Sequence, residues 1–340
     1  MTHPARAAPP LDPERVSKIL VVSLDNLGDL VFASALFPPL AERFPGARLG
    51  VWCKTYTADI AALIPKVSVV IAADPFWDRA PGRGKGRLWP FARSVAAVRR
   101  ERFDVAVLAS APWRTAAATA LSGIPVRVGR ARRRNARWLT HVLAAEDRRR
   151  PVLAEMERLL DPLGVPRQPL RYALDPAPLE PRQRALARAL PDAPVAVLHA
   201  FASKRDRCVP LREWAALARA LAARDFAVLW AGSAGELDEV RALAADDAWR
   251  YVDRLGDGSL ADTAALLSGA RLFVGHDSGP MHVAAALGVP TVGVFAPGEP
   301  SRTFPQGVAP SRVVAGATPG EIGAAAILDA VDALVGRAPG

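Results

Sequence analysis

The alternation of short apolar runs with helix-period segments is the feature that most constrains the fold of this chain. Ile19–Ser23 and Leu49–Cys53 have the length and composition of buried strands, and segments such as 31–44 and 88–100 have helical periodicity. Further strands are expected at 67–71, 105–108, 126–128, 195–199, 227–230, 272–274 and 291–295. Regular strand–helix alternation is typical of βαβ units, which build parallel sheets with helices on both faces. The sequence therefore predicts an α/β protein.

A proline-rich stretch, residues 166–181, interrupts the alternation and indicates two domains. With 340 residues, the chain also exceeds what one hydrophobic core usually organises. We expect a flexible leader over 1–15, a first Rossmann-like domain over 16–170 and a second over 171–340, whose last helix could pack back on the first. Ligands of such sheets bind beyond the C-terminal ends of the strands, so a cleft between two facing sheets is the expected site.

The positive charge is concentrated in the first half of the chain. Residues 1–171 carry 28 Lys and Arg against 15 Asp and Glu, whereas residues 172–340 carry 16 against 19. Much of the excess lies between 127 and 137, where Arg132, Arg133 and Arg134 are consecutive. Such a field attracts anionic partners, either a phosphorylated substrate or a membrane surface, and a merely solvated arginine-rich face is the alternative. No basic motif interleaved with aromatic residues accompanies it, which argues against nucleic acid as a partner.

Composition disfavours several classes of protein. The leader lacks the apolar segment of a secretory signal, and the uncharged stretch 279–298 contains three prolines and four glycines, which disfavours a membrane span. Cys53 and Cys208 fit neither a disulfide framework nor a metal-ligand spacing, so we expect a reducing cytoplasm and no metal site. The first strand is not followed by G-x-G-x-x-G, which argues against a nicotinamide dehydrogenase.

Two polar loops follow expected strands directly. Ser23-Leu-Asp-Asn-Leu-Gly-Asp29 follows the first strand, and His276-Asp-Ser-Gly-Pro-Met-His282 follows the strand at 272–274. Taken by itself, Asp29 is either a general base or the N-cap of a helix that starts near Leu30. The second loop places a hydroxyl and a flexible glycine at a helix N-terminus, which is a common site for an anion.

These loops and their flanks resemble the ADP-heptose:lipopolysaccharide heptosyltransferases, glycosyltransferase family nine. "ILVVSLDNLGDLVFASALFPPLAERFPGARLGV" is similar to the N-terminal strand, Gly-Asp turn and first helix of that family. "LADTAALLSGARLFVGHDSGPMHVAAALGVPTVGVFAPGEP" is similar to its C-terminal signature. The resemblance implies a GT-B fold and inverting transfer of a heptose from ADP-heptose to an anionic lipopolysaccharide inner-core acceptor, with no cofactor. It also implies a peripheral location at the cytoplasmic face of the inner membrane.

In the first domain, the resemblance implies that Asp29 is the general base. Asp25 stands in the same loop, where the family usually has a small residue, and is a rival carboxylate. Gly28 would permit a tight turn or a close approach of the acceptor. The arginines 132–134 would bind the acceptor's negative charge.

In the second domain, the resemblance implies a site for the ADP-sugar. Ser278 and Gly279 would bind the diphosphate, Asp277 the sugar hydroxyls, and His282 would face the diphosphate one turn into the helix. A packed core histidine is the alternative for His282. The role of His276 stays open, because the family commonly has Asn at that position.

Two further donor contacts carry over from the family. Arg207 occupies the position of a family Lys that precedes a Trp-Pro pair, although Val209 replaces the Trp here and Lys204 and Arg205 are nearby substitutes. Glu236 resembles a Glu that contacts the ribose, and a first-turn Glu that complements the helix dipole is the alternative.

Two rival functions remain at this point. One is a transferase of the same family that acts on another glycan, a protein or a metabolite. The other is a non-catalytic nucleotide-sugar-binding protein, against which the intact Asp29 argues.

Overall fold

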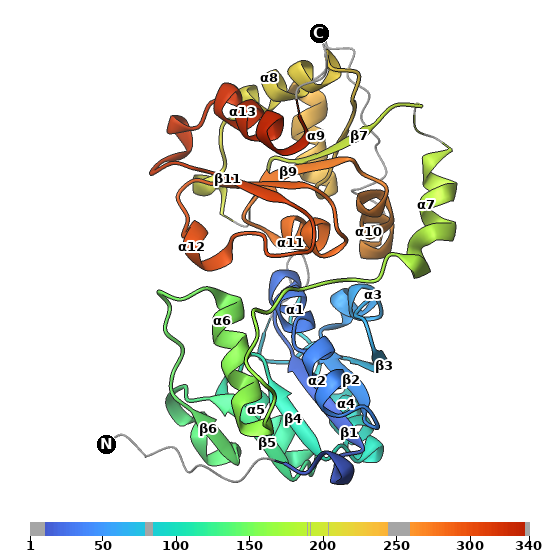
Figure 1. Cartoon of the computed structure of the whole chain (residues 1–340), viewed down its shortest axis with the longest axis vertical. Helices are drawn as coiled ribbons and strands as arrows, with labels where there is room; N and C mark the ends of the chain where they lie inside the picture. Colours follow the sequence, from blue (N-terminus) through green and yellow to red (C-terminus); the bar gives the residue numbers. More distant parts are fainter. Residues whose placement is uncertain are drawn as a thin grey trace. The chain divides into compact units, whose positions relative to one another are not determined.

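The computed structural model describes residues 11–78, 84–188, 190, 192–202, 204–243 and 259–336. The chain divides into two compact units, Met1–Tyr172 and Ala173–Gly340, and the division falls inside the proline-rich stretch. Figure 1 shows the first unit in blue to green and the second in yellow-green to red. Each unit contains one sheet of parallel strands. The prediction of an α/β fold with parallel sheets is confirmed.

The first unit contains a six-stranded sheet with the order β3-β2-β1-β4-β5-β6. Its strands are β1 (Lys18–Ser23), β2 (Arg48–Cys53), β3 (Val67–Ala72), β4 (Val105–Leu108), β5 (Val126–Arg130) and β6 (His141–Leu143). Its helices are α1 (Leu27–Ser34), α2 (Phe37–Arg43), α3 (Ala58–Ala61), α4 (Leu88–Glu101), α5 (Trp113–Leu121) and α6 (Val152–Glu157). Short 3-10 segments are η1 (Pro13–Arg15), η2 (Thr55–Thr57), η3 (Arg133–Trp138) and η4 (Arg158–Leu163).

Burial on both faces explains the continuous apolar runs of this sheet. In β1, Leu20 and Val22 join a buried cluster with Phe91 and Val98 of α4. Residues of β1 that point to the opposite face, such as Val21, are equally buried. A strand buried on both sides has no polar face to alternate with, which is why the sequence reads as an apolar run.

The second unit contains a five-stranded sheet with the order β11-β10-β9-β7-β8. Its strands are β7 (Val195–His199), β8 (Ala227–Trp230), β9 (Leu272–His276), β10 (Thr291–Phe295) and β11 (Ser311–Ala315). Its helices are α7 (Glu180–Ala187), α8 (Leu211–Ala222), α9 (Ala234–Leu243), α10 (Leu260–Ser268), α11 (Gly279–Ala286), α12 (Pro300–Thr303) and α13 (Ala324–Val335). Short 3-10 segments are η5 (Ala177–Leu179), η6 (Arg205–Arg207) and η8 (Pro319–Glu321). The last helix, α13, inserts Ile327 and Val331 into a buried cluster with Trp214 and Leu217 of α8.

The structure corrects two local expectations. The single helix expected over 31–44 is two helices, because α1 already begins at Leu27 and ends at Ser34, and prolines in the first turn of α2 start a new helix. The edge strands β6 and β11 were not expected, since they are short or largely exposed and lack an apolar run. Residues 1–10 of the expected leader lie outside the described part, and Pro13–Arg15 form a short 3-10 helix.

The strand orders locate the position where each sheet can bind a ligand. Successive strands in the first sheet run outward from β1 to β3 and then resume on the other side with β4, so the order reverses between β1 and β4. In the second sheet it reverses between β7 and β9. Loops that leave the C-terminal ends of such strand pairs diverge and leave space for a ligand. Both polar loops of the sequence leave strands of these pairs, β1 and β9.

Candidate functional site

The loop after β1 presents Asp29 in the first turn of α1. Asn26 is the N-cap residue, and its backbone N–H donates to Oδ2 of Asp29 at 3.2 Å. The expectation that Asp29 could itself be the N-cap of a helix starting near Leu30 is wrong, because Asn26 holds that position. Asp29 instead closes a capping box from the third helical residue. Gly28, one residue earlier, is in the same turn and half-exposed.

The two carboxylates of this loop hold their protons more tightly than usual. Asp29 keeps solvent access, yet the protein atoms around its carboxylate remove enough hydration to raise its pKa to about 6. The negative charge of Asp25 is the next cause, while the Asn26 N–H and the charge of Lys54 act against it. Partial burial likewise raises the pKa of Asp25, opposed by a hydrogen bond from Ser110. A carboxylate with a pKa near 6 is suited to general-base catalysis at neutral pH.

Lys54 is a residue of this site that the sequence interpretation missed. It directly follows β2, whose last residue Cys53 pairs with Ser23 of β1, so it lies beside the loop after β1. Its Nζ forms an ion pair with Asp78 at 2.8 Å and donates to Oδ1 of Asn26 at 3.4 Å. A lysine immediately after an apolar strand was the available signal.

A pocket of about 300 Å³ opens at the C-terminal ends of β4 to β6. It is lined by Ser110, Ala111, Arg130, Ala131, Arg132, Ala145, Glu146 and Arg148. Arg130 is buried and donates to the carbonyl oxygens of Ala109 at 2.6 Å and Glu155 at 2.8 Å, which makes it part of the wall. Because Ser110 both lines the pocket and hydrogen-bonds Asp25, the pocket adjoins the carboxylate pair.

The three arginines predicted to bind the acceptor differ in position. Arg132 lines this pocket and acts electrostatically on Asp25. Arg133 and Arg134 are exposed in η3, and neither is among the residues that line the pocket. The structure therefore brings Arg132 to the carboxylates and leaves the other two on the surface.

In the second unit, the strand order reverses between β7 and β9, and Ser278 contacts the last residue of each of these strands. It is the N-cap residue of α11, which begins at Gly279, and its Oγ donates to the carbonyl oxygen of His276 at 3.1 Å. The same Oγ lies 3.4 Å from Nδ1 of His199, the last residue of β7. Burial lowers the pKa of His199, so its imidazole is neutral at pH 7. The first N–H groups of α11 thus start beside the C-terminal end of β7, as an anion site requires.

Asp277 and His282 contact one another. Nε2 of His282 lies 3.6 Å from Oδ1 of Asp277, and the hydroxyl of Thr303 donates to Oδ2 at 3.1 Å. His282 is 3% exposed, which is the burial that the core alternative required. The arrangement fixes the Asp277 carboxylate at the start of α11.

His276, whose role was open, connects two loops. Its Nε2 accepts a hydrogen bond from the backbone N–H of Val209 at 3.1 Å, and its Nδ1 bonds the carbonyl oxygen of Val294 at 3.3 Å. Burial lowers its pKa to about 4, so the ring is neutral and Nε2 is free to accept. His276 therefore links β9 to the end of the loop that contains Arg205 and Arg207.

The basic residues of that loop are not equivalent. Arg205 forms a double hydrogen bond with the carboxylate of Glu239, one arm of it 2.9 Å long, and its guanidinium lies 5.2 Å from the ring centre of Phe201. Lys204 and Arg207 are exposed, and within the described part of the chain no ion pair engages either side chain. Of the three candidates for binding the diphosphate, Arg205 is thus already paired with residues of the second unit.

Glu236 lies in the first turn of α9. Its Oε2 accepts from the backbone N–H and from the hydroxyl of Ser233, both at 2.8 Å. This is the helix-terminus role that was the alternative for Glu236. Its negative charge also reaches His199, so Glu236 belongs to the same edge of the sheet as Ser278.

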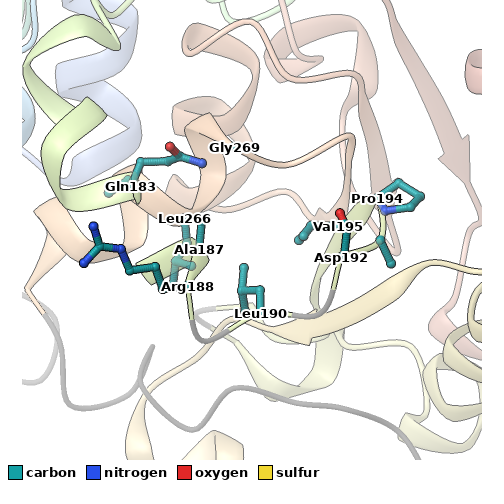
Figure 2. Close-up of a pocket in the computed structure, with 11 residues that line it drawn as sticks. Gln183, Ala187, Arg188, Leu190, Asp192, Pro194, Val195, Leu266 and Gly269 are labelled. Atoms are coloured by element: carbon teal, nitrogen blue, oxygen red, sulfur yellow. The ribbon is translucent and has the colours of Figure 1, made fainter. Parts of the chain in front are cut away.

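A second pocket, of about 570 Å³, lies at the N-terminal end of β7 (Figure 2). It is formed by α7, α10 and the segment that leads into β7, with Gln183, Arg188 and Asp192 as its polar side chains. Val195, the first residue of β7, lines it, whereas the polar loops leave the last residues of β7 and β9. Although larger, this pocket does not belong to the candidate site.

The described residues offer neither a membrane span nor a metal-binding cluster. Every helix in those ranges is too short or too polar to span a bilayer. Within the same ranges, no three His, Cys, Asp or Glu side chains converge as a metal ion would require.

The family model and the curated proteins that this chain resembles are all described as heptosyltransferases. Residues 91–320 match the model of glycosyltransferase family 9 (heptosyltransferase). Lipopolysaccharide heptosyltransferase 2 of Escherichia coli K12 is 25% identical over 308 residues, 85% of each chain. Lipopolysaccharide heptosyltransferase 1 of Pseudomonas aeruginosa is 28% identical over 310 residues, 84% of this chain and 80% of that one.

Solved structures share the fold. A family 9 glycosyltransferase from Veillonella parvula superposes with a TM-score of 0.80 at 17% identity, over 94% of this chain and 97% of that one. ADP-heptose lipopolysaccharide heptosyltransferase II of E. coli gives 0.78 at 22% identity, over 94% and 98%. The predicted GT-B fold is confirmed. With a family match over more than half of its length, the chain belongs to glycosyltransferase family 9 and is a glycosyltransferase.

Proposed function

We propose that this enzyme transfers a heptose from ADP-heptose to an anionic sugar of the lipopolysaccharide inner core, with inversion at the anomeric carbon. Support comes from relatives named as lipopolysaccharide heptosyltransferases and from the chemistry of the loop after β1. The observation that carries the proposal is Asp29, a carboxylate at a sheet switch point whose pKa is raised to about 6.

In the proposed reaction, Asp29 takes the proton of the acceptor hydroxyl. The hydroxyl oxygen then forms a bond to the anomeric carbon from the face opposite ADP, and the bond between that carbon and the diphosphate breaks. The transition state carries positive charge on the sugar ring, as in glycoside hydrolysis. Because Asp29 is mostly ionised at pH 7 and yet is a stronger base than an ordinary carboxylate, it suits this proton transfer.

The second unit is proposed to bind ADP-heptose. The N-terminus of α11, with Ser278 and Gly279, offers N–H groups and the positive end of a helix dipole to the diphosphate. Arg207 would neutralise the leaving diphosphate by bidentate hydrogen bonds. Asp277 would accept from the sugar hydroxyls and Glu236 from the ribose. Charge balance from the helix and Arg207 would make a metal or other cofactor unnecessary.

The first unit is proposed to bind the acceptor. The pocket beside Asp25 holds Arg132 and Arg148, and its position next to the carboxylate pair suits an acceptor that bears a phosphate or carboxylate. The exposed Arg133 and Arg134 would add attraction to the anionic surface of the inner membrane. The enzyme would then work as a peripheral protein on the cytoplasmic face.

A donor screen tests this proposal. Purified enzyme, supplied with lipid-linked inner-core acceptor, is offered ADP-heptose and common UDP- and GDP-sugars, and nucleoside diphosphate release is measured. We expect acceptor-dependent release of ADP from ADP-heptose only. Preferred turnover of a UDP- or GDP-sugar would contradict the donor assignment, and turnover only with a different acceptor would contradict the acceptor.

A further inference from the structure

Lys54 is the most deeply buried cation near the candidate base. Its side chain is 2% exposed, and its ammonium meets Oδ2 of Asp78 at 2.8 Å. Asp78 is itself 47% exposed, so it keeps much of its hydration. Nζ also donates to Oδ1 of Asn26 at 3.4 Å, so the ammonium reaches the loop that carries both carboxylates.

Several charged groups face this cluster from the surrounding elements. From the loop after β1 come Asp25 and Asp29, and from the segment after β2 comes Tyr56, whose Oη accepts from the backbone N–H of Leu27 at 2.9 Å. Arg132 acts on Asp25 with a positive charge, and Glu146 acts on Asp29 with a negative one. Lys54 is the positive charge common to both carboxylates.

A buried ammonium is expensive to desolvate. A purely structural role would be served as well by an apolar side chain of similar volume. The position of Lys54 is instead suited to the carboxylates, since two neighbouring negative charges repel one another and favour protonation of one of them. The positive charge of Lys54 acts on both carboxylates and opposes that protonation.

We propose that Lys54 is a positioning residue for the general base: it holds the N-cap Asn26 in place and keeps Asp29 ionised at neutral pH. The catalytic meaning of this inference rests on the proposed function, because it takes Asp29 as the base. Its electrostatic content does not depend on the reaction.

The test replaces Lys54→Met in the full-length chain and follows the Asp29 carboxyl by ¹³C NMR during a pH titration. The Asp29 signal is assigned from its loss in Asp29→Asn. The wild-type midpoint is expected near pH 6. Loss of a nearby positive charge should raise it by about half a pH unit or more. The acid limb of the pH–rate profile should move up by the same amount.

Asp78→Asn is the matched control, because it breaks the same ion pair from the other side and leaves the Lys54 charge in place. In this variant the Asp29 midpoint should stay or fall. The double variant Lys54→Met/Asp78→Asn leaves neither charge of this ion pair behind and guards against a folding defect, and its midpoint should again be raised relative to Asp78→Asn.

The outcomes separate the two proposals. An unchanged Asp29 midpoint in both Lys54 variants would overturn the role of Lys54. A raised NMR midpoint with an unmoved rate profile would leave Lys54 acting on Asp29 but would show that Asp29 is not the base.

Discussion

At the scale of single residues, Asp29 has two roles on one side chain. Its Oδ2 closes the capping box of α1, and its carboxylate is the proposed base. The first role fixes the orientation of the group, and the second requires a proton affinity above that of a free aspartate. Partial loss of hydration and the neighbouring Asp25 supply that affinity.

The pH dependence follows from these charges. Asp29 acts as a base only when it is deprotonated, so kcat/KM should fall as pH drops through about 6. Asp25→Asn removes a like charge and should move this acid limb to lower pH. Initial rates of both proteins between pH 5 and 8 check this. A limb that moves to higher pH in Asp25→Asn would contradict the assignment.

Stability should respond to the same carboxylate in the opposite sense to activity. The folded-state pKa of Asp29 is about 6, above the value of about 3.9 for a free aspartate. The folded chain therefore binds the proton more tightly and loses stability as pH rises through this window. Asp29→Asn avoids that loss, and its Oδ1 can still accept from Asn26. We expect Asp29→Asn to melt at a higher temperature than wild type at pH 8, with the difference shrinking toward pH 4. A variant that melts lower at pH 8 would show that the charged carboxylate stabilises α1 instead.

At the scale of elements, the loop after β7 would determine which cation binds the diphosphate in the proposed donor site. His276 anchors the end of this loop through the Val209 N–H, and Glu239 holds Arg205. Arg207 is left exposed in η6.

Arg207→Ala should therefore weaken ADP binding, and Arg205→Ala should weaken it much less. Charge-assisted hydrogen bonds contribute about 1.5–3 kcal/mol, which corresponds to a roughly tenfold to hundredfold rise in Kd for Arg207→Ala. Calorimetric titration of both variants with ADP measures this. A larger loss of ADP affinity in Arg205→Ala would identify Arg205 as the residue that binds the diphosphate. A loss of affinity confined to Lys204→Ala would identify Lys204.

The sequence predicted those elements whose residues form a recognisable local pattern. The core strands β1, β2, β7 and β10 were identified at or within a residue of their ends, because strands buried on both faces read as apolar runs. The start of α1 was misplaced, although Asn26 with Asp29 three residues later is a capping-box pattern. Lys54 was missed because its importance comes from β1–β2 pairing, a contact that local sequence does not reveal.

At the scale of the whole molecule, the uneven distribution of charge along the chain predicts attraction to anionic surfaces. The first 171 residues carry the positive excess, and Arg132, Arg133 and Arg134 lie on its exposed surface. Charge attraction of this kind is screened by salt, since the Debye length falls from about 10 Å at 0.1 M to about 3 Å at 1 M.

Changing these three arginines to Ser should release the enzyme from anionic vesicles at low salt and raise the KM for the acceptor. Each basic residue near such a surface contributes about 1 kcal/mol, so the loss should be large. Arg93, Arg99 and Arg100 are exposed on α4, and their change to Ser is a matched control with the same loss of charge. Equal vesicle binding by wild type and both triple variants would reduce residues 132–134 to a solvated surface.

The most direct test of the central claim, heptosyl transfer with Asp29 as base, combines turnover and binding in one variant. Asp29→Asn is compared with wild type for ADP-heptose turnover with inner-core acceptor and, by calorimetry, for ADP affinity. Loss of general-base catalysis should reduce turnover by roughly a hundredfold or more. Since the proposed donor site lies in the other unit, ADP affinity should be unchanged. Full turnover by Asp29→Asn, with the loss appearing in Asp25→Asn, would contradict the account.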